Sequence, residues 1–538
     1  MSARTHFDVA VIGGGHNGLV CACYLAAAGL SVCVLERHER VGGAAVTEEF
    51  HPGFRNSVAS YTVSLLQTKV VRDLRLHDHG LKILPRPLDN FVPSLNGCGL
   101  KLPGELDRKQ TEIARHSQAD ADRYPRFAQD LTAISQCLRP MLMQAPVDSS
   151  AGWRAWWNAL RQLSKCRHLS FRQIRICREL LTGSAGYWLE RNFETDLLLG
   201  GLGFNAIVGH FASPYDQGSA YLLLHHSLGE LNGQTGAWGH AVGGMGAITD
   251  ALAAAAATRG VDIRVRHQVE RIAQCGRRFE LHSDSAVVTA DRVAAAIHPQ
   301  TLYTQLIASD ELPPRFLQRM RNWRSESASF RLNVALSELP DFRCLPGRVP
   351  AEHHGAGILI APSLDYLDQA HQDARRAGYS SAPVIELMIP STIDDTLAPR
   401  GAHVASLFCQ HFRRNFTDGS DWSAHKQAAV DRIIAAVTDY APNFRTSILA
   451  LQAFTPQELE QRFALVGGDI FHGVMSPDQL YWSRPAFGYA RYRSPIEGLY
   501  MCASGTHPGG GVSGAPGHNA ARIMISDLQA EPTRRHRR

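Results

Sequence analysis

The sequence lacks the closely spaced cysteine pairs that disulfide reductases use. It has 538 residues and 11 cysteines, but no C-x-x-C occurs, and Cys21 and Cys23 lie nearest to each other. Redox-active dithiols need such spacing, so disulfide-reductase chemistry is disfavoured. In a chain of this length, scattered cysteines indicate reduced, buried thiols and a cytoplasmic location.

Long apolar runs and a strong excess of charge are also missing. No run approaches the roughly 20 apolar residues that span a bilayer, and no signal peptide precedes the apolar run from Phe7. The net charge of +5 is small for this length, and neither zinc-finger spacing nor an RNA-binding signature occurs. These absences argue against nucleic acid as a partner and leave only peripheral contact with a membrane.

The first 36 residues predict a nucleotide-binding unit. The β-branched run FDVAVI (7–12) predicts a buried parallel strand, the alanine-rich segment 18–30 a helix, and SVCVLE (31–36) a second strand. A G-x-G-x-x-G motif joins the first strand to the helix. Such a motif alone is a weak signal, but here the strand, helix, second strand and terminal acid all agree.

Each residue of the motif has a physical role. Gly13 permits the tight turn, Gly15 lets the backbone approach a pyrophosphate, and Gly18 lets the helix pack closely on the sheet. The helix N-terminus offers unpaired N–H groups to the phosphates. Glu36 accepts hydrogen bonds from a ribose 2′-OH and repels a 2′-phosphate. The ligand is therefore an adenine dinucleotide without that phosphate.

The stretch RHERVGGAAVTEEF (37–50) distinguishes FAD from NAD. It follows the acid directly, and Gly42–Gly43 lets the chain pass close under the second phosphate and the flavin side of the cofactor. A nicotinamide dehydrogenase has no reason for this extension. The sequence therefore predicts FAD.

Two later segments belong to the same site. Segment 243–272 reads as a glycine turn, a helix and a strand pair, which a right-handed crossover returns to the first sheet, with Val269 beside the adenine. Segment 291–297 predicts another core strand. Segment 498–528 runs from a strand into a glycine loop that closes over the ribityl and pyrophosphate. It contains a second G-x-G-x-x-G, Gly509–Gly514, but no βαβ unit follows, so a separate NAD site is rejected.

These segments predict an α/β fold with a Rossmann-like FAD-binding domain (an FAD/NAD(P)-binding fold) and an interleaved α+β substrate domain. Stretches 329–339, 383–389 and 403–412 predict strands of a sheet that roofs a cavity between the domains. The expected boundaries are 1–85, 236–299 and 491–530 for the discontinuous FAD-binding domain, 86–235 and 300–490 for the substrate-binding domain, and 531–538 for a basic tail.

Several long stretches carry a resemblance to a known family. VIGGGHNGLV (11–20), GAWGHAVGGMGAI (236–248) and LYMCASGTHPGGGVSGAPGHNAA (499–521) resemble the FAD-dependent phytoene desaturase-like oxidoreductases. Within that family they are most similar to the branch of pyridine nucleotide-disulfide oxidoreductase domain-containing protein 2. The similarity runs from the first strand to nearly the last helix and is more specific than a Rossmann motif alone.

The resemblance implies which residues contact the cofactor. Those expected to line FAD are Gly13, Gly15, Gly18, Glu36, Arg37, Gly43, Ala44, Val269, Gly505, Gly511 and Val512, and those expected to approach the isoalloxazine ring are Ala59, Ser60 and Tyr61. Two positions depart from relatives. Related amine oxidases carry Arg where this chain has Ala44, which argues against that branch. Many flavoproteins carry Asp before the last glycine loop, where this chain has Ser504, so one charged contact to the cofactor is lost.

The expected chemistry is hydride transfer to flavin N5, while the protein orients the substrate and excludes water. Loss of hydride needs a delocalised cation, which a conjugated or allylic substrate provides, and a base then takes the partner proton. His507, in the loop expected to face the flavin, is the first candidate base. Candidates for the substrate pocket are Tyr215, Asp216, Trp238 and Trp482. Loop packing or cofactor support is the alternative role for each.

The leading hypothesis is an FAD-dependent desaturase or dehydrogenase that acts on a long, apolar, unsaturated substrate such as an isoprenoid, polyene or lipid. Oxygen or a quinone is the expected electron acceptor, because the chain offers no NAD site. The alternatives are a saturation, an oxidase of an amine or another natural-product intermediate, a redox-neutral isomerase, and a non-catalytic FAD-binding scaffold at a membrane.

Segment 152–178 predicts a helix with an apolar aromatic face. It has seven Lys or Arg residues and no acid, and one face carries Trp153, Trp156, Trp157, Leu160 and Leu163. Such a helix either dips into an anionic lipid surface or packs its apolar face on the core. The basic run 534–538 predicts a solvated tail that adds attraction to a membrane.

Three histidine pairs invite a metal hypothesis, His77/His79, His225/His226 and His353/His354. Zinc sites use histidines at i, i+4 on a helix together with an acid, or histidines together with a cysteine. These pairs have neither arrangement. No metal is therefore expected, and these histidines are interpreted as ordinary surface or core residues.

Overall fold

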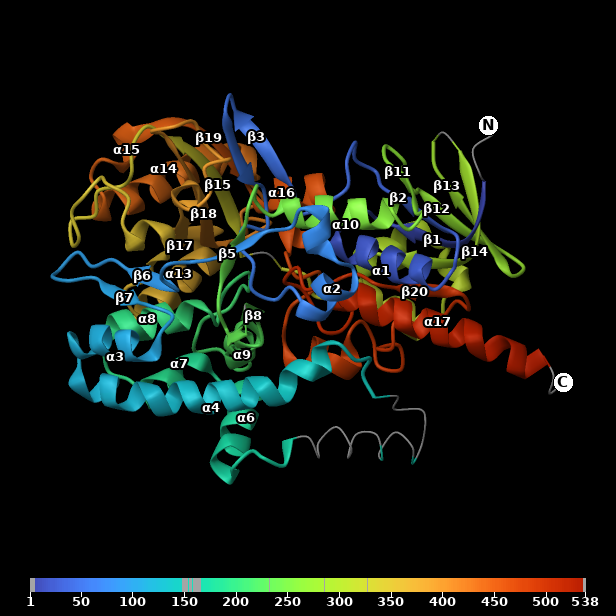
Figure 1. The fold of residues 1–538 in the computed structure, drawn as a ribbon, viewed down its shortest axis with the longest axis horizontal. Helices are drawn as coiled ribbons and strands as arrows, with labels where there is room; N and C mark the ends of the chain where they lie inside the picture. Colours follow the sequence, from blue (N-terminus) through green and yellow to red (C-terminus); the bar gives the residue numbers. More distant parts are fainter. Residues whose placement is uncertain are drawn as a thin grey trace.

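The computed structural model describes residues 5–147, 153, 157, 166–231, 233–284, 286–326 and 328–535. Two sheets lie side by side, each with its own helices (Figure 1). In the first sheet the order is β11–β2–β1–β14–β13–β12, and β20 also pairs with β14. Its strands are β1 (His6–Ile12), β2 (Val32–Leu35), β11 (Asp262–Arg264), β12 (Arg271–Cys275), β13 (Arg278–His282), β14 (Val287–Ala295) and β20 (Leu499–Met501).

The register of three parallel strands sets the position of the glycine loops. Ile12 at the end of β1 pairs with Ala295 at the end of β14, and Ala295 pairs with Met501 at the end of β20. Parallel strands whose last residues are aligned deliver the segments that follow them to the same edge of the sheet. The loops after residues 12, 295 and 501 therefore start side by side.

Three helices pack on this sheet: α1 (His16–Ala27), α10 (Gly246–Ala257) and α17 (Ala515–Arg535). They bury an apolar cluster that includes Val9, Leu19 and Leu252. α1 and α17 approach so closely that a Cβ on Gly517 would overlap the carbonyl oxygen of Asn17. The helix after the last glycine loop is thus fixed against the helix after the first.

The second sheet has the order β19–β15–β18–β17–β16–β6–β7. It contains the strands expected over 329–339, 383–389 and 403–412. Along β18, Leu407 and Cys409 face the core under α14, whereas Phe408 joins the cluster on the opposite face. The strands and covering helices are β6 (Asn90–Val92), β7 (Leu100–Leu102), β15 (Phe330–Leu336), β16 (Gly357–Ile360), β17 (Tyr379–Met388), β18 (His403–Phe412), β19 (Ile448–Phe454), α13 (Leu364–Ala377) and α14 (Trp422–Tyr440).

A layer of helices borders the second sheet (Figure 1). It is made of α3 (Leu106–Ala114), α4 (Gln118–Leu142), α6 (Phe171–Thr182), α7 (Ala185–Glu190), α8 (Asp196–Phe204) and α9 (Ala220–Ser227). The other named segments are β3 (Thr47–His51), β4 (Phe54–Ser57), β5 (Ile83–Pro85), β8 (Glu230–Leu231), β9 (Gln234–Thr235), β10 (Gly239–Ala241), α2 (Thr68–Asp73), α11 (Pro299–Thr301), α12 (Pro314–Arg321), α15 (Phe444–Ser447) and α16 (Pro456–Phe463).

The basic aromatic segment expected over 152–178 falls mostly outside the described residues. Trp156, Leu160 and Leu163 lie outside them, whereas Trp153 and Trp157 are described and exposed. The end of the segment forms the first part of α6, on the outside of the helical layer (Figure 1). Among the described helices, none combines the length and the apolar character that crossing a bilayer requires.

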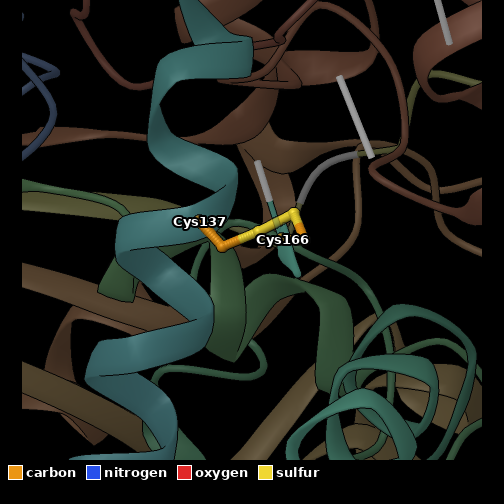
Figure 2. The surroundings of a disulfide bond; sticks show 2 residues. All are labelled: Cys137 and Cys166. Carbon is orange, nitrogen blue, oxygen red and sulfur yellow. A yellow bond between two sulfur atoms is a disulfide. The ribbon is translucent and has the colours of Figure 1, made fainter. Parts of the chain in front are cut away.

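The expectation that all cysteines are reduced and buried is wrong. A disulfide joins Cys137 in α4 to Cys166 shortly before α6, with their Cα atoms 5.5 Å apart (Figure 2). Cys98 and Cys275 are free but exposed. The two bonded cysteines are 29 residues apart in the sequence, and only the packing of α4 beside the start of α6 brings them together.

A buried arginine ties the loop after β20 to the segment around Phe471. Arg484 has no exposed surface, and its guanidinium donates hydrogen bonds to the Ser504 carbonyl at 2.9 and 3.1 Å and to the Phe471 carbonyl at 2.7 Å. Asp469 lies nearby, and burial raises the pKa of its carboxyl to about 6. A buried cation surrounded by carbonyl oxygens fixes both loops, because moving either one leaves the charge without partners.

Arg484→Lys should therefore lower the free energy of unfolding. An ammonium keeps the charge but cannot reach these carbonyls at the same time, so we expect a loss of about 2–4 kcal/mol in denaturant unfolding. The control is Arg324→Lys, in an exposed ion pair with Asp478, for which we expect a change within about 0.5 kcal/mol. Equal losses in the two variants would contradict the role given to Arg484.

Candidate functional site

A cavity of about 630 Å³ lies at the ends of β1, β14 and β20. The loop after each of these strands contributes to its wall, through Gly13 after β1, His298 after β14 and Ser504 after β20. The second sheet contributes Phe408 from β18. The cavity therefore lies between the two sheets, where segments far apart in the sequence meet.

Most of the residues expected to contact the cofactor line this cavity. They are Gly13, Gly15, Gly18, Glu36, Arg37, Gly43, Ala44, Ala59, Ser60, Tyr61, Val269, Gly511 and Val512. Gly505 is the exception, and its neighbour Ser504 lines the cavity instead. A Cβ on Gly505 would overlap the ring of Pro299. This glycine is therefore explained by close packing of the loop against α11 rather than by contact with a ligand.

The glycines of the first loop differ in conformation and in what surrounds them. Gly13 has a φ of 97°, a left-handed conformation that favours glycine. A Cβ on Gly18 would overlap the Gly13 carbonyl oxygen, so this position is closed by the protein itself. A Cβ on Gly15 would have no protein atom within 4 Å. Gly15 thus borders open space on the cavity wall, as expected where a phosphate approaches the backbone.

Hydrogen-bond donors and acceptors at the nucleotide end fit an adenine dinucleotide. The N-cap of α1 is Gly15, which has no side chain to occupy the first N–H groups of the helix. These N–H groups therefore remain available to phosphates. Glu36 accepts hydrogen bonds from the backbone N–H groups of Gly14 at 2.7 Å and His38 at 2.9 Å. These contacts hold the carboxylate on the cavity wall, where its remaining lone pairs would be free to accept from a ribose hydroxyl.

Buried polar atoms on the cavity wall also call for a polar ligand. His16 Nε2, Asn17 Oδ1 and His472 Nδ1 line the cavity but have no hydrogen-bond partner among the described residues. Burial lowers the pKa of His16 to about 4 and that of His472 to about 3. Both imidazoles are therefore neutral near pH 7, and each can donate one hydrogen bond to the cofactor without adding charge.

Aromatic side chains surround the other end of the cavity, which we call the aromatic chamber. Its walls are Tyr61, His226, Trp238 and Phe408. The ring of Tyr61 stacks on Phe408 with centroids 5.3 Å apart, and His226 stacks on Trp238 at 5.8 Å. Stacked flat rings on a cavity wall suit a largely apolar ligand.

A charged network lies behind the chamber wall. The Tyr61 hydroxyl donates to the carboxylate of Glu386, which also pairs with the guanidinium of Arg86 at 3.4 Å. Arg331 lies beside Tyr61, with its guanidinium 4.4 Å from the ring centroid. Burial raises the pKa of Tyr61 well above its usual value and lowers the pKa of Arg331 to about 10. Near pH 7, Tyr61 is therefore neutral and Arg331 is charged.

His507 is not in the position expected for a catalytic base. It is buried outside the cavity wall, with Nε2 3.0 Å from the carbonyl oxygen of Met141 and its ring against Tyr481. The main-chain course of the glycine loop carries Ser504 and Gly511 into the cavity but turns His507 toward the end of α4. The sequence showed that this residue belongs to the loop, but not which way it points.

Three of the four expected pocket residues also lie elsewhere. The Tyr215 hydroxyl donates to Glu190 at 2.6 Å near the surface, and Trp482 is 47% exposed. Asp216 lines a separate cavity of about 690 Å³ together with His210 and Arg413. Of the expected pocket residues, Trp238 lines the aromatic chamber.

Sequence reasoning missed several residues of the cavity wall. His16 stands between two motif glycines, and this position could have identified it. His298 and Phe408 depend on where β14 ends and how β18 faces, which only the register of the sheets shows. His226 was interpreted as an ordinary histidine because its pair lacks metal-binding spacing. Within the described ranges, no group of histidine, cysteine and acidic side chains is arranged to bind a metal ion.

Comparison with known proteins agrees with this geometry. The family described as flavin containing amine oxidoreductase matches residues 18–329. The pyridine nucleotide-disulfide oxidoreductase domain-containing protein 2 of Mus musculus is 39% identical over 549 residues, covering 98% of this chain and 94% of the mouse protein. One of the subunits of limonene dehydrogenase from Castellaniella defragrans is 27% identical, covering 98% of this chain and 96% of that protein.

More distant similarities extend over nearly the whole chain. The lycopene-forming phytoene desaturase of a Paracoccus species is 23% identical, covering 96% of this chain and 97% of the desaturase. The solved structure of cyclohexylamine oxidase from Brevibacterium oxydans has a TM-score of 0.59 at 17% identity, covering 97% of this chain and 99% of the oxidase. The predicted fold class, the resemblance and FAD as cofactor are confirmed.

Gly15→Ala and Gly18→Ala should separate cofactor binding from folding. The methyl group of Gly15→Ala extends into open space at the wall, so we expect unchanged stability of the FAD-free protein but FAD affinity reduced at least about tenfold. The methyl group of Gly18→Ala meets the Gly13 carbonyl and should lower the free energy of unfolding by about 1–3 kcal/mol even without FAD.

Flavin absorbance per protein and denaturant unfolding of the FAD-free protein measure the two effects. The matched control is wild-type protein that is stripped of FAD and then reloaded. A glycine variant far from the site, such as Gly260→Ala, does not serve, because Gly260 has a φ of 76° and any side chain there is strained. Full FAD affinity in Gly15→Ala would show that the cofactor phosphates do not approach this backbone.

Proposed function

We propose, from the premise that this chain belongs to the flavin containing amine oxidoreductase family, that it dehydrogenates a long, apolar, unsaturated molecule. An isoprenoid, a polyene or a lipid has this character. The chain is an FAD oxidoreductase, and the proposal concerns its substrate and the direction of its reaction. The supporting observation is the aromatic chamber, which adjoins the residues expected to approach the isoalloxazine ring.

The distribution of carboxylates in the cavity supports an apolar substrate. Among the described lining residues, the acids are Glu36, Glu270 and Glu460. Glu36 is held by backbone N–H groups at the nucleotide end, and Glu270 directly follows Val269. Glu460 pairs with Arg414. None of these acids lies in the aromatic chamber, so an ammonium group there would lack a counter-ion.

The chain supplies positioning and proton transfer, and FAD, when bound, would supply the hydride acceptor. The chamber excludes water and holds the substrate against the cofactor. His226 is the candidate proton acceptor, because Nδ1 lies 3.0 Å from the Asn205 carbonyl oxygen and must carry the hydrogen. Nε2 then keeps its lone pair, and burial lowers the pKa of His226 to about 4, so the ring is neutral near pH 7. A weak base suffices, because a carbon next to an allylic cation is strongly acidic.

The relatives support both an apolar substrate and the amine alternative. Limonene dehydrogenase and phytoene desaturase are named for unsaturated hydrocarbons, whereas cyclohexylamine oxidase is named for an amine. The acid-free chamber favours the first group. We also propose oxygen or a quinone as the acceptor that returns the cofactor to its oxidised form.

Anaerobic bleaching of the flavin tests the proposed function. We expect limonene or squalene to bleach the purified FAD protein, and the saturated compounds p-menthane and squalane to leave it yellow. His226→Gln should bind the same compounds but slow bleaching by about 100-fold, the usual contribution of a positioned base.

The amine cyclohexylamine is the discriminating control. Bleaching by cyclohexylamine with none by the unsaturated hydrocarbons would replace the proposal with an amine oxidase. A flavin that no compound reduces would favour a non-catalytic, FAD-binding scaffold. Unchanged bleaching in His226→Gln would remove this histidine from the reaction but would leave the substrate class in place.

We further propose peripheral membrane contact through α6, the described end of segment 152–178. The inner face of this helix buries Ile176 and Leu180. Its outer face exposes 93% of Phe171 and 52% of Ile174, beside the exposed Arg175. Apolar side chains flanked by cations are typical of helices that lie in an anionic lipid interface. Trp153 and Trp157, also exposed, precede this helix in the sequence.

The double variant Phe171→Asp/Ile174→Asp should weaken binding to lipid vesicles. Both side chains point away from the core, so folding should be unaffected, and we expect at least about tenfold weaker co-sedimentation with vesicles of phosphatidylglycerol and phosphatidylcholine. Phe487→Asp, at a residue 62% exposed outside this helix, is the matched control. Vesicle binding that survives the double variant would contradict the proposed contact.

A further inference from the structure

Arg331 is a buried cation beside the aromatic chamber. It lies in β15 and is 1% exposed, with its guanidinium 4.4 Å from the ring centroid of Tyr61 and 5.8 Å from that of Phe408. Nη2 donates to the Ser406 hydroxyl at 2.6 Å. Nε and Nη1 have no hydrogen-bond partner among the described residues. No carboxylate forms an ion pair with Arg331 in that part of the chain.

The nearby carboxylate of Glu386 is committed to other groups. One of its oxygens accepts from the Tyr61 hydroxyl, and the other pairs with Arg86. Arg86 also donates to Thr62 at 2.6 Å and lies 5.4 Å from the ring centroid of Trp238. The cluster therefore contains two guanidinium groups and one carboxylate, all buried. Its formal charge is positive.

We propose that Arg331, supported by Arg86, is a specificity residue that excludes cationic ligands from the aromatic chamber. Aromatic rings attract a ligand cation through their negative faces. Here a guanidinium already lies beside each of Tyr61, Phe408 and Trp238. An ammonium in the chamber would meet rings that already contact a guanidinium. The positive charge of the Arg331–Arg86–Glu386 cluster would also repel it, because the protein interior screens charge poorly.

This inference rests on the proposed function only in placing the substrate in the chamber. It goes further by naming the residues that separate neutral substrates from amines of the same shape. An open aromatic chamber without cations behind its rings would favour ammonium ligands instead. The sign of the charge behind the rings, rather than the aromatic character of the rings, therefore sets the preference for neutral over cationic ligands.

Matched ligands test the inference without knowledge of the natural substrate. Decylamine and 1-decanol have the same chain length and differ mainly in charge at pH 7. Each is titrated into the FAD-loaded protein, and binding is read from the perturbation of the flavin absorption spectrum. We expect decylamine to bind at least about tenfold more weakly than 1-decanol, as a like charge within about 8 Å at an effective dielectric constant near 20 requires.

Variants at Arg331 test whether its charge causes the weaker binding of decylamine. Arg331→Met should narrow the difference between the two ligands to within about threefold, whereas Arg331→Lys should keep most of it. Arg413→Met is the matched control, because Arg413 pairs with Glu326 outside the chamber, and it should leave the ratio unchanged. Should Arg331→Met fail to fold, Arg86→Met and the wild-type ratio still test the proposal.

Three results would overturn the inference. The first is decylamine binding as tightly as 1-decanol to the wild-type protein, the second is a ratio that Arg331→Met does not change, and the third is no spectral response to either ligand. The outcome is distinct from that of the bleaching test. Strong rejection of decylamine without bleaching by any hydrocarbon would remove the proposed reaction but keep the specificity residue.

Discussion

The site depends on one constraint, the parallel pairing of β14 with β1 on one side and β20 on the other. Because Ile12, Ala295 and Met501 are aligned in register, segments almost 500 residues apart leave the sheet at the same edge. The glycine loop after β1 then meets the loops that carry His298 and Ser504. Without this alignment, the individual motifs would be turns with no common ligand.

A buried charge fixes one of the loops that leave the first sheet. Arg484 fixes the loop after β20 by binding the carbonyls of Ser504 and Phe471, so the last part of the cofactor wall depends on a residue outside the glycine motifs. The nearby imidazoles of His16 and His472 stay neutral because burial lowers their pKa. These two histidines therefore add polar atoms to the cavity wall without adding charge.

Local sequence carried enough information to find residues that line one cavity, while their contacts with FAD stay a prediction. The G-x-G-x-x-G loop, Glu36 and Val269 are local patterns with known geometry, and they line the cavity as expected. The direction of His507, the position of Phe408 and the Cys137–Cys166 bond depend on how distant elements pack, which periodicity cannot reveal. The domain boundaries stay a prediction. The chamber was predicted only in part: Tyr61 and Trp238 were expected near the flavin or in the pocket, whereas His226 on α9 and Phe408 on β18 were not.

The chamber explains how one fold can serve substrates of opposite character. One fold hosts many reactions, and apolar, aromatic-lined pockets bind many kinds of ligand, so neither the fold nor the rings identify the substrate. What distinguishes them is the electrostatic potential inside that space. In this chain, Glu386 is neutralised by Arg86 and held by Tyr61, while Arg331 adds an unpaired positive charge. An ammonium that entered would lose its hydration and gain no counter-ion, a cost that a neutral substrate would not have. The proposed preference for neutral substrates therefore rests on Arg331, Arg86 and Glu386, which lie behind the cavity wall rather than on it.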